Sequence, residues 1–283
     1  MRYSAYIVNQ PIDAHVHVWT DHRDLYPRAA GALEYPPERF TPEDFLSHAR
    51  PSGITRAVLV QMSFYGFDNS YMLDTITAHP DAFSGIAVVD SAAADLDSAM
   101  RALAAQGVRG FRISPGESSR GWLDAPGMTS MWRSGAARRL AMCLLIDPEM
   151  LPDVGSMCEH FPDTPVVIDH LARIGVDGQI RDSDTRRLCS LAKYRNVYVK
   201  VSAFYALGRK RVPYGDLAPL IRRVFEAYGP QRLMWASDCP FQVEDGHTYA
   251  ASLALITGGL PFLSAEDRSW LLARTAESIF FTA

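Results

Sequence analysis

Short apolar runs alternate with longer stretches of helical spacing along the whole chain. Several runs, such as residues 57–60 and 142–146, are apolar at consecutive positions, as in a parallel sheet that is covered on both faces. The pattern predicts eight strands, at residues 12–19, 57–62, 84–90, 108–114, 142–147, 166–170, 197–202 and 233–238.

The stretches between these runs carry helix signals. Thr41 is placed as an N-cap with Pro42 at the first helical position. Residues 95–105 form a helical stretch that ends before Gly107, and Ser264 opens the last helix. Strands that alternate with helices in this way predict a parallel sheet.

The number of strands and the length of 283 residues favour an α/β fold with one (β/α)₈ TIM-barrel domain over residues 1–283. No Gly-x-Gly-x-x-Gly follows the first strand, which argues against a dinucleotide-binding fold. Residues 20–40 form the longest connection and are rich in Pro and Tyr. A loop of that length predicts a lid or a wall of the substrate site.

Composition narrows the class of protein. The chain is 48% hydrophobic and 21% charged with a net charge of -4, and charges of both signs are mixed along it. We therefore expect a soluble protein with a small-molecule partner, without nucleic acid or membrane partners, as a monomer or a homodimer. The first ten residues lack a secretory signal and four cysteines lack paired spacing, so we expect a cytoplasmic location with free thiols.

Polar side chains recur at the predicted carboxyl ends of the strands, where such barrels carry their chemistry. On the first strand Asp13, His15 and His17 share one parity, so all three are expected to point into the barrel. Later strands end in Gln61 and Ser63, Arg112, Asp147, Asp169 and His170, Lys200 and Ser202, and Ser237 and Asp238. Buried polar groups are costly unless they are paired or used, so this pattern indicates an enzyme.

Five of these side chains are candidate catalytic or binding groups: His15, His17, Arg112, His170 and Asp238. Two imidazoles on one face of a strand suit a divalent metal ion, or can polarise one carbonyl oxygen. Asp238 could instead lie in a structural salt bridge, and His170 could be a hydrogen-bonded core histidine. Arg112 could simply pair with Asp90 or Asp147. Because all these groups would converge on one cavity, we favour the functional interpretation.

Five segments resemble the amidohydrolase superfamily, in particular its amidohydrolase-2 branch. They occur in order along nearly the whole chain, at residues 12–19, 60–69, 169–173, 199–203 and 235–240. The branch includes lactonases of pyrone dicarboxylates and of sugar acids. The resemblance implies a TIM barrel that hydrolyses a carbonyl-centred bond, with a catalytic group of His15, His17, His170 and Asp238.

The resemblance also implies a substrate-binding set. Arg112 matches a position that binds a substrate carboxylate, and the loop after the second strand would line the pocket. Further anion-binding arginines are expected at the positions of Arg120 and Arg209. The predicted substrate-binding residues are Ser63, Tyr65, Asn69, Arg112, Arg120 and Arg209.

The sequence departs from the metal-dependent members of the superfamily. Arg112 stands where they have Lys or Glu on the fourth strand, and residues 145–147 of the fifth strand contain no His. These departures argue against a binuclear site. They leave either no cofactor, or one divalent metal ion (zinc or manganese) held by His15, His17 and Asp238.

The leading hypothesis is a lactonase that opens a small carboxylated lactone, with Asp238 as general base. A second hypothesis is a metal-dependent decarboxylase of a small aromatic or semialdehyde acid. A third is a non-catalytic barrel that binds an organic acid. Asp238 argues against the third hypothesis, because a carboxylate beside the histidines would repel a bound anion.

Overall fold

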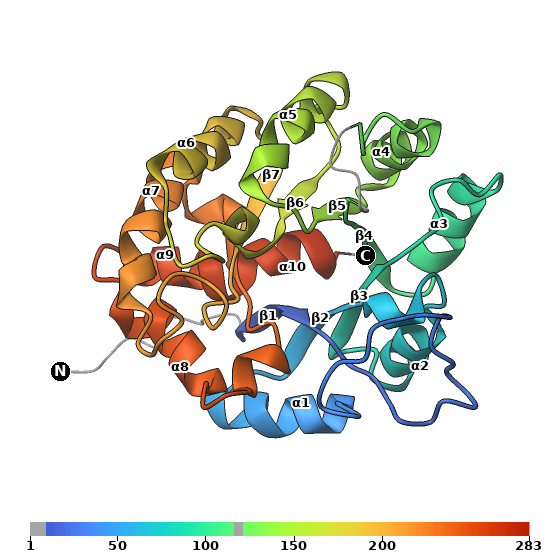
Figure 1. Ribbon diagram of the computed structural model, residues 1–283, viewed down its shortest axis with the longest axis horizontal. Helices are drawn as coiled ribbons and strands as arrows, with labels where there is room; N and C mark the ends of the chain where they lie inside the picture. Colours follow the sequence, from blue (N-terminus) through green and yellow to red (C-terminus); the bar gives the residue numbers. More distant parts are fainter. Residues whose placement is uncertain (1–9, 116–120, 283) are drawn as a thin grey trace.

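A computed structural model describes residues 10–115 and 121–282. Eight parallel strands form its centre, and helices surround them (Figure 1). The sheet order follows the chain, β1 to β8, and each strand pairs with the next. The strands are β1 (Ile12–Val16), β2 (Arg56–Val60), β3 (Phe83–Ala87), β4 (Val108–Ile113), β5 (Ala141–Leu144), β6 (Val166–Ile168), β7 (Val197–Val201) and β8 (Leu233–Trp235).

Residues just after β8 close the sheet onto β1. The backbone N–H of Asp238 donates to the carbonyl of His15 at 2.9 Å, and that of His17 donates to the carbonyl of Cys239 at 2.8 Å. The predicted (β/α)₈ barrel is therefore confirmed. All eight predicted strands are present, but each ends earlier than predicted, so several of their terminal polar residues, such as Gln61, His170 and Asp238, lie in the segments that follow.

The helices between the strands include both predicted starts. Thr41 and Asp44 form a capping box at the first helix, and Ser264 and Asp267 form another where the last helical region begins. A π-helical segment, Trp270–Arg274, joins α9 to α10. The helices are α1 (Pro42–Ala49), α2 (Ser70–Ala78), α3 (Leu96–Ala104), α4 (Pro126–Arg138), α5 (Leu151–His160), α6 (Asp182–Ser190), α7 (Ala218–Tyr228), α8 (Tyr249–Ala254), α9 (Ala265–Ser269) and α10 (Thr275–Phe280).

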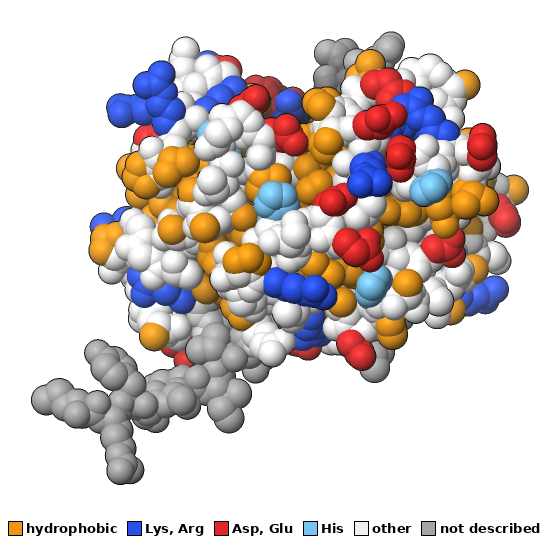
Figure 2. All heavy atoms as spheres, turned by 90° about the horizontal axis from the view of Figure 1, so that it is seen from below, with side chains coloured by type: hydrophobic (Ala, Val, Ile, Leu, Met, Phe, Trp, Pro, Cys, Tyr) orange, Lys and Arg blue, Asp and Glu red, His pale blue; other side chains and the backbone are white. Residues whose placement is uncertain are grey.

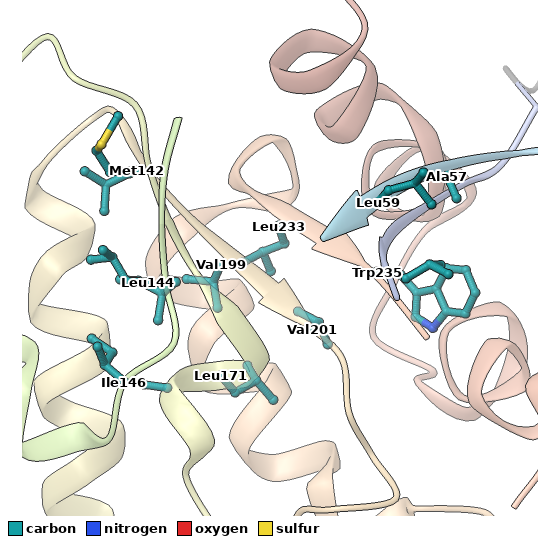
Figure 3. Packing of buried hydrophobic residues seen from close by; sticks show 14 of the residues in the cluster. Ala57, Leu59, Met142, Leu144, Ile146, Leu171, Val199, Val201, Leu233 and Trp235 are labelled. Atoms are coloured by element: carbon teal, nitrogen blue, oxygen red, sulfur yellow. The ribbon is translucent and has the colours of Figure 1, made fainter. Parts of the chain in front are cut away.

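The apolar core has two parts. The outer part lies between strands and helices, and takes alternate residues of each strand, such as Met142 and Leu144 of β5 (Figure 3). The inner part fills the barrel with side chains that include Val58, Cys143 and Met234. The barrel is thus a packed core, and a ligand site must lie at one of its ends.

Helix α10 covers the amino ends of the strands. It crosses the middle of the ring in Figure 1 and adds Ile279 and Phe280 to the inner cluster. Arg56, the first residue of β2, pairs with Glu277 of α10. With this end covered, the opposite end of the barrel is the place for a substrate.

A bulge in β1 corrects the expectation for Asp13. The pairing of β1 with β2 shifts register between Asp13 and Val16. Asp13 therefore faces outwards, where it accepts hydrogen bonds from the Tyr249 hydroxyl at 2.9 Å and the Ser237 backbone N–H at 2.9 Å. An irregular strand breaks the parity rule, so Asp13 supports the loop after β8 and does not enter the barrel with His15.

The surface of the protein carries charges of both signs. Basic and acidic side chains are interspersed on the face shown in Figure 2. No helix among the described residues is long and apolar enough to cross a membrane.

Trp19 and Phe40 pair across the ends of the 20–40 loop. Tyr35 from this loop lines the main cavity, which agrees with its predicted role as a wall.

Candidate active site

A cavity of about 520 Å³ opens at the carboxyl ends of the strands. Its polar lining comes from His17, Gln61, Ser63, Asp90, Ser91, Arg112 and Ser114. Most of the remaining wall is apolar, from Met62, Phe67, Val88, Val89, Ile113, Met128, Met131, Leu145 and Phe241. The size suits a small ligand with an apolar body and few polar groups.

Three imidazoles converge on one carboxylate oxygen beside this cavity. Oδ1 of Asp238 lies 3.5 Å from Nε2 of His15 and 3.4 Å from Nε2 of His17. Nε2 of His170 lies 3.8 Å from the same oxygen. All four side chains are nearly inaccessible, and His17 reaches the cavity wall. The structure therefore brings together the four predicted catalytic residues, which come from β1 and from the segments just after β1, β6 and β8.

The two oxygens of Asp238 have different surroundings. Tyr205 donates its hydroxyl to Oδ2 at 2.7 Å. Oδ1 accepts no hydrogen bond from the residues that the structure describes. Burial alone would raise the pKa of Asp238, but the neighbouring His170, His17 and His15 hold it below its usual range. Asp238 is therefore an ionised carboxylate with one oxygen free to accept a proton.

Burial also acts on two of the imidazoles beside Asp238. Burial, together with the positive charge of Lys200, lowers the pKa of His15 well below its usual value. Burial also lowers the pKa of His170. Nδ1 of His17 lies 2.8 Å from the carbonyl oxygen of Val60, which only accepts, so His17 carries a proton on Nδ1, and in its neutral form the lone pair is on Nε2.

Below the imidazoles lies a buried network of charges centred on Asp169. Lys200 Nζ is 3.0 Å from Asp169 Oδ1, and Arg112 donates to Asp169 Oδ2 from Nη2 at 3.1 Å. Burial by itself would raise the pKa of Asp169, but Lys200, His15 and Arg112 hold it well below its usual value. Two cations therefore stabilise one buried anion.

This network corrects the expected partner of Arg112, which is Asp169 and neither Asp90 nor Asp147. Side chains inside a (β/α)₈ barrel form layers from alternate strands, so β4 shares a layer with the end of β6. Asp147 instead pairs with Arg173, 3.2 Å away, outside the main cavity.

The segment that carries His170 has a strained backbone. Four consecutive residues, His170 to Arg173, have φ between 52° and 57°, in the left-handed region that side chains other than Gly rarely adopt. Each such residue costs about 1–2 kcal/mol. The Ser202 hydroxyl lies 2.9 Å from Nδ1 of His170 and holds the ring at the end of this turn. Strain of this kind is typical of functional sites.

Among the described residues, two groups of side chains have the chemistry of a metal site: His15, His17 and Asp238, and His15, Asp169 and His170. In the first, the unpartnered Oδ1 of Asp238 lies 3.4 Å from Nε2 of His17, and two imidazoles with one carboxylate form the donor set for one divalent ion. In the second, Lys200 already contacts the Asp169 oxygen, so a second ion does not fit.

The predicted substrate-binding residues lie in different places. Ser63 and Arg112 line the cavity. The Tyr65 hydroxyl accepts a hydrogen bond from the backbone N–H of Thr20, and the Asn69 side chain bonds the backbone of Phe67 and Val88. Both are therefore outside the cavity lining and support its loops. Arg120 lies outside the described residues.

Arg209 is not among the residues that line the cavity. It is exposed, and its backbone N–H donates to the Asp216 carboxylate at 2.7 Å. The region of residues 209–211 lies in the loop between β7 and α7. The structure places no contact between Arg209 and the four central side chains.

Sequence reasoning gave no role to three residues that surround the site. Lys200 and Asp169 were recognisable as charges at the ends of apolar strands, and the pattern Val197-Tyr198-Val199-Lys200-Val201 puts Lys200 on the face opposite the valines. Tyr205 carries no comparable signal, because it lies in a loop whose path the sequence does not define.

The chain belongs to the amidohydrolase family: the family Amidohydro_2 matches residues 12–282. It is 29% identical over 255 residues to the L-fucono-1,5-lactonase of Burkholderia ambifaria, with 86% of this chain and 85% of that protein covered. It is 30% identical over 233 residues to the 4-sulfomuconolactone hydrolase of Rhizobium radiobacter, with 81% and 75% covered.

A solved structure shows the same architecture. A probable 2-pyrone-4,6-dicarboxylic acid hydrolase from Acinetobacter baumannii, with citric acid bound, has a TM-score of 0.81 at 27% identity and covers 96% of this chain and 100% of its own. The resemblance carried by the five sequence segments is thus confirmed, and with it the assignment to the hydrolases of the amidohydrolase superfamily.

Proposed function

We propose that this protein is a lactonase that opens a small carboxylated lactone, with Asp238 as general base. The observation that supports this most is the unpartnered Oδ1 of Asp238, which faces three imidazoles beside a cavity. A base and hydrogen-bond donors at one point are what acyl transfer to water requires.

The proposed reaction uses both parts of this arrangement, the base and the hydrogen-bond donors. A water molecule attacks the lactone carbonyl carbon while Asp238 Oδ1 takes its proton. The carbonyl oxygen becomes an oxyanion, and the imidazole N–H group of His170 stabilises it. The C–O bond of the ring then breaks, and the proton on Asp238 passes to the leaving oxygen. The product is the open hydroxy acid, with one water consumed.

His15, His17 and Asp238 would also be the ligands of a metal ion, and zinc or manganese suits such a set of two imidazoles and one carboxylate. Such an ion supplies Lewis acidity towards the carbonyl oxygen when bound. In the proposed reaction the side chains themselves transfer the proton and orient the substrate.

Arg112 is the residue that we assign to the substrate carboxylate. It is the one cation in the described part of the cavity lining, where Asp90 is also present. A single carboxylate therefore matches the wall better than two. The citric acid bound to the Acinetobacter baumannii relative shows that a protein of this fold with 27% identity holds an organic acid.

The apolar wall indicates the body of the substrate. Met62, Phe67, Ile113 and Phe241 offer no hydrogen bonds to ring hydroxyl groups. Hydroxyls of a sugar lactone that meet this apolar part of the wall would go unpaired, at about 1–3 kcal/mol each, whereas those that reach Ser63, Ser91 or Ser114 could be paired. We therefore favour an unsaturated or alkyl-substituted lactone of the muconolactone type over a sugar lactone.

The test is a panel of lactones with the released acid measured by a pH indicator. We expect kcat/KM for a carboxylated unsaturated lactone to exceed that for L-fucono-1,5-lactone by at least about tenfold, since one unpaired hydroxyl costs that much. Preference for the sugar lactone would contradict the substrate class alone. Release of CO₂ from an aromatic acid without lactone hydrolysis would contradict the lactonase, as would tight acid binding without turnover.

A further inference from the structure

Lys200 lies under the catalytic imidazoles and is completely buried. Its Nζ is 3.1 Å from Nδ1 of His15 and 3.0 Å from Oδ1 of Asp169. The ring of Phe280, from α10, lies 5.6 Å away on the inner side. A lysine ammonium paired with a carboxylate has three donors and no acceptor, so it hydrogen-bonds His15 only when the nitrogen that faces it carries a lone pair.

This contact decides the tautomer of His15. With a lone pair on Nδ1, the ring proton sits on Nε2, which lies 3.2 Å from Nε2 of His17. His17 carries its own proton on Nδ1, towards the Val60 carbonyl at 2.8 Å, so its Nε2 accepts. Each group therefore donates a hydrogen bond to the next: Lys200 to His15, His15 to His17, and His17 to the Val60 carbonyl. Every ring nitrogen of the two histidines then has a partner.

The same series opposes a metal ion. To ligate a metal at the group His15, His17 and Asp238, His15 must offer a lone pair on Nε2, and its proton must then move to Nδ1. There the proton faces the Lys200 ammonium, and the other available acceptor, Asp169 Oδ1, is 3.5 Å away. Metal binding thus breaks the hydrogen bond between Lys200 and His15 and adds a cation near an existing one.

We propose that Lys200 fixes His15 as the Nε2–H tautomer and thereby weakens metal binding at His15, His17 and Asp238. Lys200 is a positioning residue, since it acts through His15 and lies beneath the cavity. The inference concerns the hydrogen bonding of the site and does not depend on which lactone is hydrolysed.

The tautomer can be measured on the wild-type protein. With [¹⁵N]histidine-labelled protein free of metal, the ¹⁵N shifts and long-range ¹H–¹⁵N couplings identify which ring nitrogen of His15 is protonated, and His15→Gln assigns the resonance by its loss. We expect the Nε2–H form. An Nδ1–H form of His15 in the wild-type protein would overturn the proposal, whatever the protein hydrolyses.

Metal affinity provides the second measurement. In Lys200→Met the stem remains but the donor is lost, so His15 can give its Nδ1–H to Asp169. We expect the affinity for Zn²⁺, measured by competition with a chromophoric chelator, to rise by ~10–100-fold, the size of effect typical for a partner of a metal ligand. Unchanged or weaker affinity in the folded variant would contradict the proposal.

Two further variants control this measurement. Cys143→Ala removes another buried side chain from the inner cluster, whose thiol faces the Ala141 carbonyl, and we expect wild-type Zn²⁺ affinity. Lys200→Gln replaces the ammonium with an amide whose oxygen can accept the His15 Nδ1–H. This variant takes the place of Lys200→Met in the Zn²⁺ measurement if Lys200→Met does not fold. A Zn²⁺ affinity of Lys200→Gln equal to that of the wild type would also overturn the proposal.

Discussion

Tyr205 donates its hydroxyl to Oδ2 of Asp238 at 2.7 Å and turns the other carboxylate oxygen towards the imidazoles. Tyr205 is itself largely shielded in the loop after β7, and burial raises the pKa of its phenol, with Asp238 raising it further. The phenol therefore stays protonated and acts as a donor at all working pH values. This relationship explains how one oxygen of a buried carboxylate can remain available as a base.

The first prediction concerns this positioning. Tyr205→Phe removes the hydroxyl and leaves Asp238 free to turn. We expect kcat to fall about 10- to 100-fold with little change in KM, because misplacement of a catalytic group by a fraction of an ångström has costs of this order. The loss of a hydrogen bond to the ionised form should also raise the pKa of Asp238. A variant in which KM rises while kcat stays at the wild-type value would contradict this role.

The second prediction concerns the base. Asp238→Asn should lower kcat by about 10²–10⁴, the usual contribution of a positioned general base. The fold should remain, because the Asn amide oxygen can still accept from Tyr205. Thermal unfolding followed by circular dichroism checks this point. Near-wild-type turnover in the folded variant would show that another group is the base.

A matched control for this substitution is Asp147→Asn. Asp147 also follows a barrel strand, but it pairs with Arg173 outside the main cavity. We expect kcat and KM of this variant to stay within about twofold of the wild type, as for a surface ion pair of small energetic weight.

The sequence was sufficient to predict the barrel and the central cluster. His15, His17, His170 and Asp238 interrupt or end apolar runs, and the convergence of strand ends in a barrel follows from the fold itself. Parity along a regular strand then puts His15 and His17 together. The structure agrees, since both face Asp238.

The sequence was insufficient where a local irregularity or a pairing across the barrel decides the geometry. Asp13 turns outwards because β1 has a bulge, which the alternation of residues does not reveal. The pairing of Arg112 with Asp169 crosses from β4 to the end of β6, and neighbouring strands had suggested other partners. Side chains in loops, such as Tyr205, depend on a backbone path that has no periodic signal.

The third prediction concerns pH. Burial lowers the pKa of His170 below the ordinary 6.5, and the surrounding imidazoles lower that of Asp238 below the ordinary 3.8 despite its burial. Catalysis uses the neutral imidazole and the ionised carboxylate, so both active forms persist as the pH falls through 6.5. We expect kcat/KM to stay level from about pH 8 to below 6.5. An acid limb centred at or above 6.5 would contradict these assignments.

The fourth prediction concerns Arg112, which lines the cavity and donates to Asp169 from Nε and Nη2. Arg112→Met removes the cation but leaves Asp169 paired with Lys200. We expect kcat/KM for a carboxylated lactone to fall about 10- to 150-fold, the worth of a hydrogen bond to a charged group. The methyl ester of the same lactone lacks the negative charge, so its kcat/KM should fall much less.

The comparison of the two substrates separates binding of the carboxylate from damage to the site. If Arg112 acts mainly by holding Asp169 in place, both the lactone acid and its ester lose activity equally, because Asp169 lies next to His15. If Arg112 binds the carboxylate, the preference of the wild-type enzyme for the acid disappears in the variant. Arg112→Lys should recover part of that preference, because it keeps the charge but cannot form a bidentate contact.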